Sequence, residues 1–466
     1  MQTVKLLPFI VLLCLSLGCG GYNMEEIYKS LEAGKPEAAL NYLDEKSPDK
    51  ENLPFLFERG LVAHYADRYQ ESNTALSRAE SISEDLYTRS ISKEAAALVT
   101  SDLVRPYAGE RYERLLSHYY RILNYLYLND IEDALVECRR ATRLIRYYIN
   151  EDEDYDCFGA GFLAYLSGIL FESSGELNDA FISLQQAEAY YERAASETGV
   201  DLPENLGISL VRLARRLGFP EEESLYLRKY GDPHVRTEGY GELVLFYETG
   251  FVPPKYEETL TFPILKSDSF EDDTRSSFAR TLVSRRGKSF SETKLEYLLH
   301  VAIPAIRSNR PRFTGITAEA GDVEGRGILV ADVEAMAIET LKSREGGILL
   351  RTVARALLKY LAYRQVTKKS DDENGEEEVD HTKEILMDLL GRAVNVVNIA
   401  TEHADTRSWQ TLPNQIFLLR MRLPAGTHTV KLEFSDRFKR GPEFESLEDV
   451  VIRKNEPTFL NYRSFE

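Results

Sequence analysis

Cysteine and long hydrophobic runs are scarce in this sequence, and basic residues are outnumbered by acidic ones. The 466 residues include four cysteines, which excludes a small disulfide scaffold. The longest apolar run, at positions 6–17, is shorter than the roughly 20 residues that a helix needs to cross a bilayer. The formal net charge of −19, from 57 basic and 76 acidic residues, repels polyanions, so nucleic acid is not an expected partner.

What the chain does contain is a composition typical of folded proteins. Hydrophobic residues make up 43% and charged residues 29%, and there are 27 tyrosines and 21 phenylalanines. This composition excludes a disordered chain and a multi-span membrane protein. At about 100–200 residues per domain, the length predicts roughly two to four domains with sizeable cores.

Residues 1–18 form a predicted export signal. A single positive charge precedes the apolar run at 6–17, and that run has the length of a signal-peptide hydrophobic region. The glycine followed by Cys19 resembles the bacterial lipoprotein cleavage site, which implies that diacylglycerol is attached to the Cys19 thiol. Ser16 stands where such signals usually carry leucine, so the alternative is a secreted product with a coincidental cysteine. Gly20, in place of aspartate, implies an outer-membrane destination in a host with two membranes.

Two further cysteines remain in the mature chain, Cys138 and Cys157. In an oxidising compartment these two thiols could form a disulfide. The alternative is that both are small buried hydrophobes, since Cys138 lies where a predicted helix would pack. The sequence leaves both interpretations open.

From residue 24 to about 230 the apolar residues recur at three- and four-residue steps, which predicts helix after helix. Short polar turns are predicted at 34–39, 67–69, 129–131, 175–177 and 218–220. Small or apolar residues recur at identical offsets in three units: Gly60, Ser72, Leu76 and Ala79; Ile122, Ala134, Cys138 and Ala141; Gly168, Ala180, Leu184 and Ala187. This pattern resembles the tetratricopeptide repeat, in which small residues let paired helices approach closely.

The spacing of these units departs from the tetratricopeptide family. They begin 62 and 46 residues apart instead of at multiples of about 34. Insertions or a further degenerate helix pair are therefore predicted at 81–109 and 150–159.

The tetratricopeptide resemblance implies that residues 19–230 present a concave surface to a peptide or protein and carry no catalytic groups. Arg139, Arg140 and Arg143 lie on one predicted helix and are the candidates for lining that surface. The alternative is a solvated face on which these arginines pair with nearby acidic residues such as Glu137.

Residues 235–466 are predicted to form an α+β domain with a β-sandwich-like sheet completed from both ends of the region. Segments 241–248 and 256–264 have the β-branched and aromatic content of strands, joined as a hairpin around a Gly/Pro turn. The other predicted elements are a strand at 295–306, helices at 332–343, 348–364 and 382–401, and strands at 416–423, 427–434, 447–453 and 458–463, with a glycine pair at 346–347 and a tight turn at 424–426. The predicted fold class is α+β multidomain.

Four segments, at 107–113, 134–140, 241–255 and 404–413, together resemble the uncharacterised tetratricopeptide-containing envelope lipoproteins of Gram-negative bacteria. The resemblance spans nearly the whole mature chain. It implies a lipid-anchored protein at the outer membrane that faces the periplasm. It implies no particular reaction, because the family has no agreed biochemical activity.

The most distinctive of these segments contains Asp405, Arg407 and the only tryptophan, Trp409. An aspartate followed by threonine, arginine and serine after a helix can cap backbone groups and form a fixed ion pair. That is the structural interpretation of the segment. The alternative is that Asp405, Arg407 and Trp409 form a site at which a partner docks.

Catalytic and metal-binding patterns are weak. The seven histidines include no pair at the i, i+4 spacing of a zinc-binding helix. Residues 291–294 have the serine–lysine spacing of penicillin-recognising enzymes, but the companion motifs are absent. The glycine-rich stretch 321–327 carries acidic residues where a phosphate would sit, and it is predicted to be a hairpin turn. We therefore expect no catalytic residue, no metal and no cofactor.

These patterns favour a non-enzymatic scaffold that is anchored through Cys19 and binds another envelope protein or peptide through its helical repeats. The C-terminal domain would supply a second docking surface. Two alternatives remain: an enzyme that acts on cell-wall or envelope polymer, with the repeats as a targeting arm, and a structural component of a secretion or appendage assembly.

Overall fold

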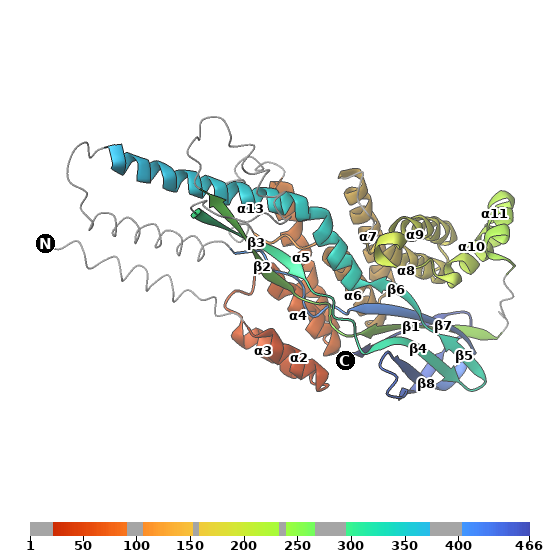
Figure 1. The fold of residues 1–466 in the computed structure, drawn as a ribbon. Helices are drawn as coiled ribbons and strands as arrows, with labels where there is room; N and C mark the ends of the chain where they lie inside the picture. Colours follow the sequence, from red (N-terminus) through yellow and green to blue (C-terminus); the bar gives the residue numbers. More distant parts are fainter. Residues whose placement is uncertain (1–21, 91–105, 152–157, 233–238, 266–294, 373–402) are drawn as a thin grey trace.

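The computed structural model describes residues 22–90, 106–151, 158–232, 239–265, 295–372 and 403–466, with helices first and strands concentrated in the C-terminal part (Figure 1). This arrangement confirms the predicted α+β multidomain class. Within these ranges the helices before residue 231 form consecutive pairs: α2 (Met24–Glu32) with α3 (Pro36–Lys46), α4 (Leu53–Tyr65) with α5 (Tyr69–Ser90), α6 (Arg111–Tyr127) with α7 (Ile131–Glu151), α8 (Ala160–Ser173) with α9 (Leu177–Thr198), and α10 (Glu204–Leu217) with α11 (Pro220–Tyr230).

A glycine on the first helix of two pairs lets the second helix approach closely. A Cβ atom on Gly60 would lie 2.5 Å from the Cδ2 of Leu76, and one on Gly168 would lie 2.5 Å from the Cδ2 of Leu184. The repeat pattern in the sequence aligned these same residues, so the pattern corresponds to a physical contact. At the turn between α8 and α9, Gly175 has a φ of +80°, a left-handed conformation that glycine adopts without strain.

The substitution Gly168→Val should lower the free energy of unfolding by about 1–3 kcal/mol, because the added methyl groups overpack the contact with Leu184. Gly346→Ala is the matched control. No heavy atom lies within 4 Å of the Cβ position there, and alanine stabilises a helix by up to about 1 kcal/mol relative to glycine. Chemical denaturation followed by far-UV circular dichroism measures both variants, and equal stabilities would contradict the close approach.

Strands from both ends of the C-terminal part form two four-stranded sheets, ordered β10-β1-β7-β6 and β5-β4-β8-β9. β1 is parallel to β10 and antiparallel to β7, as expected for a sheet completed from both ends of the region. The strands are β1 (Tyr240–Thr249), β4 (Phe313–Ala320), β5 (Val323–Arg326), β6 (Ile328–Asp332), β7 (Gln415–Pro424), β8 (Gly426–Asp436), β9 (Glu443–Ile452) and β10 (Pro457–Ser464). The last four strands lie where the sequence predicted them. A hairpin turn does follow β4, but it is confined to 321–322, and β5 occupies most of the stretch 321–327 that was predicted to be the turn.

The strand β1 has a nearly continuous apolar sequence because both faces of its sheet are covered. Leu243, Leu245 and Tyr247 point into the core between the two sheets. Val244 and Phe246 belong to the core shared with the helices. Since successive residues of a strand point to opposite faces, the sheet of β1 is the layer between the helical repeats and the second sheet.

Three sequence predictions about this part are wrong. β1 does not form a hairpin with β2 (Lys255–Leu265), which pairs with β3 (Leu295–Ile306), because the doubly buried β1 lies between β7 and β10. The turn at 424–426 carries the chain from one sheet to the other instead of joining paired strands. The helix α13 (Val333–Asp372) continues through both predicted helices and the glycine pair at 346–347, since each glycine costs a helix only about 1 kcal/mol.

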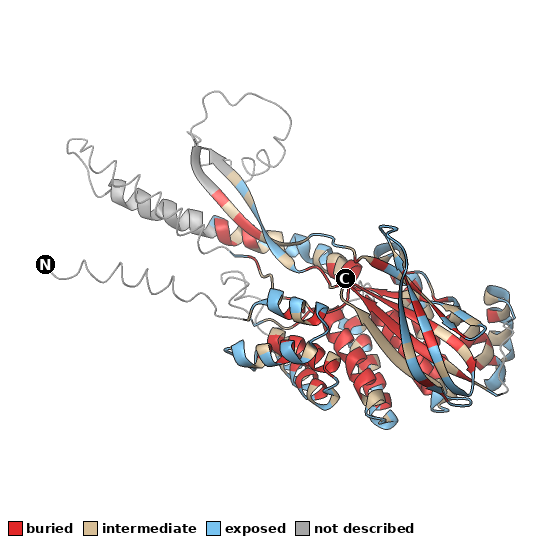
Figure 2. Cartoon of the chain, turned by 90° about the horizontal axis from the view of Figure 1, so that it is seen from below, coloured by how far each residue is buried: buried red, intermediate tan, exposed pale blue. Residues whose placement is uncertain are grey.

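We call β2, β3 and α13 the arm, because together they project from the rest of the molecule (Figure 2). Val353 and Ala356 of α13 pack against Leu299 and Val301 of β3, which gives the arm a small apolar core of its own. Within the described ranges no helix combines the length and apolar character needed to cross a bilayer.

Several predictions fall outside the described residues: the signal at 1–18, the lipidation of Cys19, the pattern at 291–294, the helix at 382–401 and the position of Cys157. They stay predictions. Cys138 is a buried free thiol in α7. Its burial raises the pKa of the thiol to about 12. Its surroundings match the interpretation as a small buried hydrophobe, and a disulfide with Cys157 is not tested.

Candidate functional site on the helical repeats

The first helices of the pairs share one face, and the sheet of β1 covers that face (Figure 1). Tyr65 of α4 and Tyr119 of α6 both donate hydrogen bonds to Glu248 of β1, at 2.6 and 2.9 Å. Further along the repeats, Arg420 of β7 donates to the hydroxyl of Tyr165 in α8 at 3.2 Å. The expectation that this face is open to a partner is therefore wrong, because the chain's own C-terminal part occupies it.

The segment around Trp409 attaches the C-terminal part to α4 and α6. The indole ring of Trp409 is fully buried and stacks on Phe57 of α4, with 4.6 Å between the ring centroids. The backbone N–H of Trp409 donates to Oε1 of Glu113 at 2.7 Å, and the indole N–H donates to the hydroxyl of Thr411 at 3.1 Å. Trp409 therefore binds the chain's own helices, and its side chain has no exposed surface for a partner.

Glu58 of α4 is a buried carboxyl group that holds the same segment by three hydrogen bonds. The backbone N–H of Gln410 donates to Oε1 at 2.6 Å, and the backbone N–H and hydroxyl of Thr411 donate to Oε2 at 3.1 and 2.5 Å. Burial raises the pKa of Glu58 to about 7, even though these three donors act to lower it. One side chain of the repeats thus satisfies two backbone N–H groups of a segment that lies about 350 residues later in the chain.

The start of α6 anchors the arm as well as the segment around Trp409. Glu110 accepts hydrogen bonds from Lys255 of β2 and Arg344 of α13, each at 2.5 Å. Burial alone would raise the pKa of Glu110, but these two cations lower it to about 2. At Glu113 burial and the nearby charge of Glu110 raise the pKa. The first turn of α6 therefore connects the repeats, the arm and the sandwich.

Asp405 and Arg407 adopt the structural arrangement that the sequence suggested as one alternative. Oδ1 of Asp405 accepts the backbone N–H of Arg407 at 3.1 Å and its Nε at 2.8 Å, while Oδ2 accepts Nη2 at 2.7 Å. The aspartate is therefore both a cap and one half of a fixed ion pair. Each side chain keeps 27% of its surface exposed, so a docking role for these two residues stays a prediction.

Arg139, Arg140 and Arg143 lie on α7, which is the second helix of its pair, so they do not line the face that the sheet covers. Arg139 pairs with Glu176 at 2.5 Å, and Arg140 pairs with Glu137 at 3.3 Å. Arg143 is exposed and makes no ion pair within the described ranges. These arginines lie away from the face that the sheet covers, and a partner-binding role for them stays a prediction.

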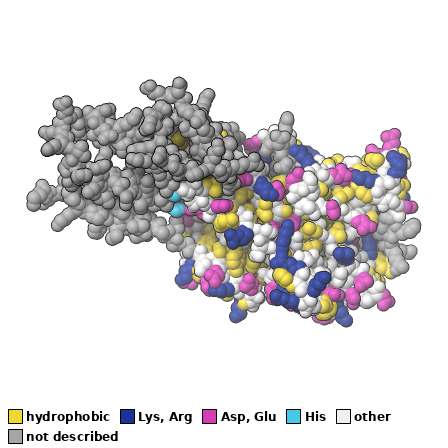
Figure 3. Space-filling view, in the orientation of Figure 1, with side chains coloured by type: hydrophobic (Ala, Val, Ile, Leu, Met, Phe, Trp, Pro, Cys, Tyr) yellow, Lys and Arg dark blue, Asp and Glu magenta, His cyan; other side chains and the backbone are white. Residues whose placement is uncertain are grey.

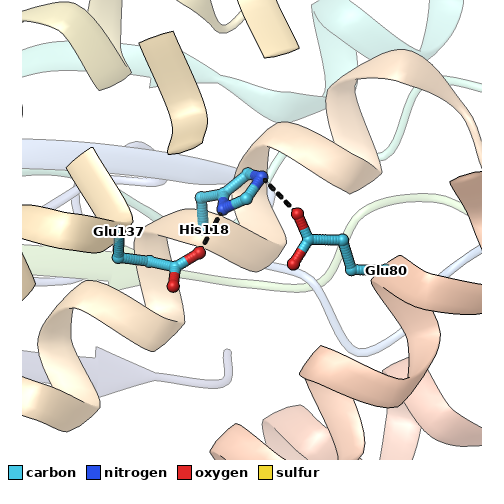
Figure 4. A group of neighbouring side chains, drawn as sticks. All are labelled: Glu80, His118 and Glu137. Atoms are coloured by element: carbon cyan, nitrogen blue, oxygen red, sulfur yellow. Dashed lines mark hydrogen bonds and ion pairs between the residues drawn. The ribbon is translucent and has the colours of Figure 1, made fainter. Parts of the chain in front are cut away.

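Glu80, His118 and Glu137 meet where α5, α6 and α7 converge (Figure 4), with candidate ligand atoms within 4.8 Å of one another. Nδ1 of His118 lies 2.6 Å from Oε1 of Glu137, and Nε2 lies 3.5 Å from Oε1 of Glu80. Arg121 pairs with both carboxylates. Burial would raise the pKa of Glu137, but His118 and Arg121 lower it. Because the guanidinium of Arg121 already pairs with both carboxylates, these donors fit an ion-pair network that joins three helices better than a metal centre.

The stacked helix pairs with their glycine contacts decide the fold of the N-terminal part. It is a tetratricopeptide-like helical repeat. No protein-family model matches the sequence, and no curated protein matches it either. Similar solved structures include the apo form of RapI, with a TM-score of 0.30 and 14% identity over 44% of this chain and 48% of RapI.

Two other solved structures show a similar degree of likeness. The TPR-like repeats of a putative kinesin light chain from Podosopora anserina match with a TM-score of 0.29 and 13% identity, over 44% of this chain and 90% of that chain. BtubC (BKLC) from P. vanneervenii matches with a TM-score of 0.29 and 12% identity, over 46% of this chain and 80% of that chain. The chain spans about half the length of RapI, 48%, and the likeness concerns the helical fold alone.

Proposed function

We propose that this protein is a lipid-anchored scaffold of the cell envelope that binds another protein through the outward face of its helical repeats. A lipid on Cys19 would tether it to the outer membrane, facing the periplasm, as the N-terminal pattern and the family resemblance imply. The observation that carries the proposal is the position of the C-terminal sheet, which covers the first helices and joins both parts into one body. The second helices are the face left for a partner.

Four residues of α7 form a stripe on this outward face: Val136, Arg140, Arg143 and Tyr147, which we call the α7 stripe. Their spacing of i, i+4, i+7 and i+11 places them on one side of the helix. Val136 and Tyr147 are 40% and 39% exposed. Tyrosine and arginine are enriched in protein interfaces. In a chain of net charge −19, the cationic α7 stripe favours a partner with an acidic segment.

Crosslinking in the native envelope tests the α7 stripe. A photo-crosslinking residue in place of Arg143 should capture a single partner, and adding Arg140→Glu with Tyr147→Ala should reduce the yield about tenfold or more, because interface anchors of these types are worth about 2 kcal/mol or more. Phe438 is the matched control position, since it is 52% exposed on the sandwich. Equal capture from positions 143 and 438, or a yield that the two substitutions leave unchanged, would contradict the proposed face.

Removal of the lipid-bearing thiol should release the protein into the soluble periplasm. Each buried CH₂ of an acyl chain contributes about 0.8 kcal/mol to membrane binding, so Cys19→Ala removes the whole anchor. Cell fractionation followed by immunoblotting measures the change, and Cys138→Ala, at a buried position in α7, is the control that should stay with the membrane. A Cys19→Ala protein that remains in the membrane fraction would show that the anchor lies elsewhere.

A further inference from the structure

A hollow of about 360 Å³ lies where α10 meets the sheet of β1 and β7. Ser209 and Arg212 line it from α10, Glu242 from β1, and Arg420 and Arg422 from β7. The volume falls within the range of small-molecule sites, about 300–1,000 Å³. The hollow shares no residue with the α7 stripe, so its role is independent of the proposed function.

The guanidinium of Arg420 lines this hollow and is held in place by hydrogen bonds within the protein. Its Nε and Nη2 each donate to the carboxylate of Glu242 at 2.9 Å, a bidentate ion pair. Its remaining nitrogen, Nη1, lies 3.2 Å from the hydroxyl of Tyr165 and 3.4 Å from that of Ser209. All three nitrogens of this guanidinium therefore have partners inside the protein.

Arg212 and Arg422 keep donors that the protein does not use. Nη2 of Arg212 pairs with Glu172 at 2.6 Å, and its Nε is buried with no hydrogen-bond partner among the residues that the structure describes. The side chain of Arg422 is half-buried and makes no hydrogen bond or ion pair with any residue that the structure describes. The guanidinium of Arg422 therefore has N–H donors that an acceptor from outside the chain can take without displacing a contact within the protein.

The charged residues that line the hollow are three arginines and two glutamates, Glu242 and Glu324. Burial, together with the charges of Arg420 and Arg422, lowers the pKa of the Arg212 guanidinium despite the nearby carboxylates of Glu172 and Glu242. Over the face drawn in Figure 3, acidic and basic side chains are interspersed. Among the lining residues, Arg212, Arg420 and Arg422 exceed Glu242 and Glu324 by one positive charge, in a chain whose net charge is −19.

We infer that this hollow binds a small oxyanion, a carboxylate or a phosphate group, through Arg212 and Arg422. The guanidinium group presents paired N–H donors that match two oxygens of such a group. Glu242 and Glu324 leave the lining with one net positive charge, which favours a small ligand that carries a single anionic group.

Thermal unfolding of the purified full chain tests the inference with two probes, inorganic phosphate and butyrate. At least one of them should raise the unfolding temperature in a saturable way, beyond the effect of sodium chloride at the same ionic strength. Arg422→Gln should weaken that binding about tenfold or more, because charge-assisted hydrogen bonds are lost. Arg216→Gln is the matched control, since Arg216 lies on the same helix, is 52% exposed and does not line the hollow.

Arg212→Gln provides a second variant, and far-UV circular dichroism shows whether each variant is folded before binding is measured. Binding of phosphate alone, or of butyrate alone, would support the site and assign its chemical class. The inference would be overturned if neither probe shifted the unfolding temperature more than chloride did. It would also be overturned if folded Arg422→Gln and Arg212→Gln bound the probes as tightly as the wild type.

Discussion

Trp409→Ala should lower the free energy of unfolding by about 3–5 kcal/mol, the range for deleting a large buried aromatic side chain. The ring is fully buried and stacks on Phe57, so its loss leaves a cavity between α4 and the C-terminal part. The rigid helices around that cavity cannot collapse to fill it. Chemical denaturation followed by far-UV circular dichroism measures the change.

The control for this substitution is Phe438→Ala, which removes an aromatic ring that is 52% exposed on the same domain. Surface substitutions of this kind usually change stability by less than about 0.5 kcal/mol. Should Trp409→Ala and Phe438→Ala prove equally mild, the segment around Trp409 would not be what joins the two parts. Because Trp409 is the only tryptophan, its fluorescence in the wild type reports directly on this interface.

Glu58→Ala should be of similar severity, with a loss of about 3–5 kcal/mol near pH 5, because three donors lose their acceptor and each unsatisfied buried donor costs about 1–3 kcal/mol. These donors are the backbone N–H groups of Gln410 and Thr411 and the hydroxyl of Thr411. Denaturation monitored by Trp409 fluorescence measures the loss. Glu51→Ala is the matched control, since Glu51 is 65% exposed and forms a surface ion pair with Arg78. A comparable loss there would contradict the assignment.

The loss in the free energy of unfolding caused by Glu58→Ala should also depend on pH. Burial holds the pKa of Glu58 at about 7, so the folded protein keeps a proton that the unfolded chain loses above about pH 4.3. The resulting stabilisation is fully present below the unfolded pKa and is lost as the pH rises through about 7. The difference in stability between wild type and variant should therefore shrink, by at most about 3 kcal/mol, between about pH 5 and pH 8.

Comparison of the wild type with Glu58→Ala isolates this group from other buried carboxyls. Glu110, whose pKa is lowered to about 2, stabilises the fold above the unfolded pKa and loses that effect only in strong acid. It is present in both proteins and cancels from the difference. If the difference in stability grew as the pH rose, the folded protein would favour the ionised form of Glu58. That result would contradict the prediction from the burial of this carboxyl group.

Local patterns in the sequence predicted the elements that depend on neighbours in the chain. The offset that joins Gly60 to Leu76 and Gly168 to Leu184 identified the helix pairs, because close approach of two helices requires a small residue at a defined place. The glycine-rich turn after β4 and the last four strands were likewise visible, because alternation and turn residues act over a few positions.

Two features of the sequence point to the interface between the repeats and the C-terminal part. Glu58 sits in the apolar stretch LPFLFERGLVAHY, where a charged residue at a buried position indicates a partner from elsewhere in the chain. The unbroken apolar run of β1 indicated a strand covered on both faces, which a hairpin at the edge of a sheet would not need. Both signals show that a partner exists without showing which segment provides it.

The sequence by itself determined the tetratricopeptide-like helix pairs and the strand-rich C-terminal part, while the export signal with Cys19 stays a prediction. Only the tertiary structure decided that β1 pairs with β7 and β10, that Glu58 holds the segment around Trp409, and that α7 faces outward. The physical reason is that helix and strand periods arise from bonds within a few residues, whereas the choice between faces is made by contacts between segments hundreds of residues apart.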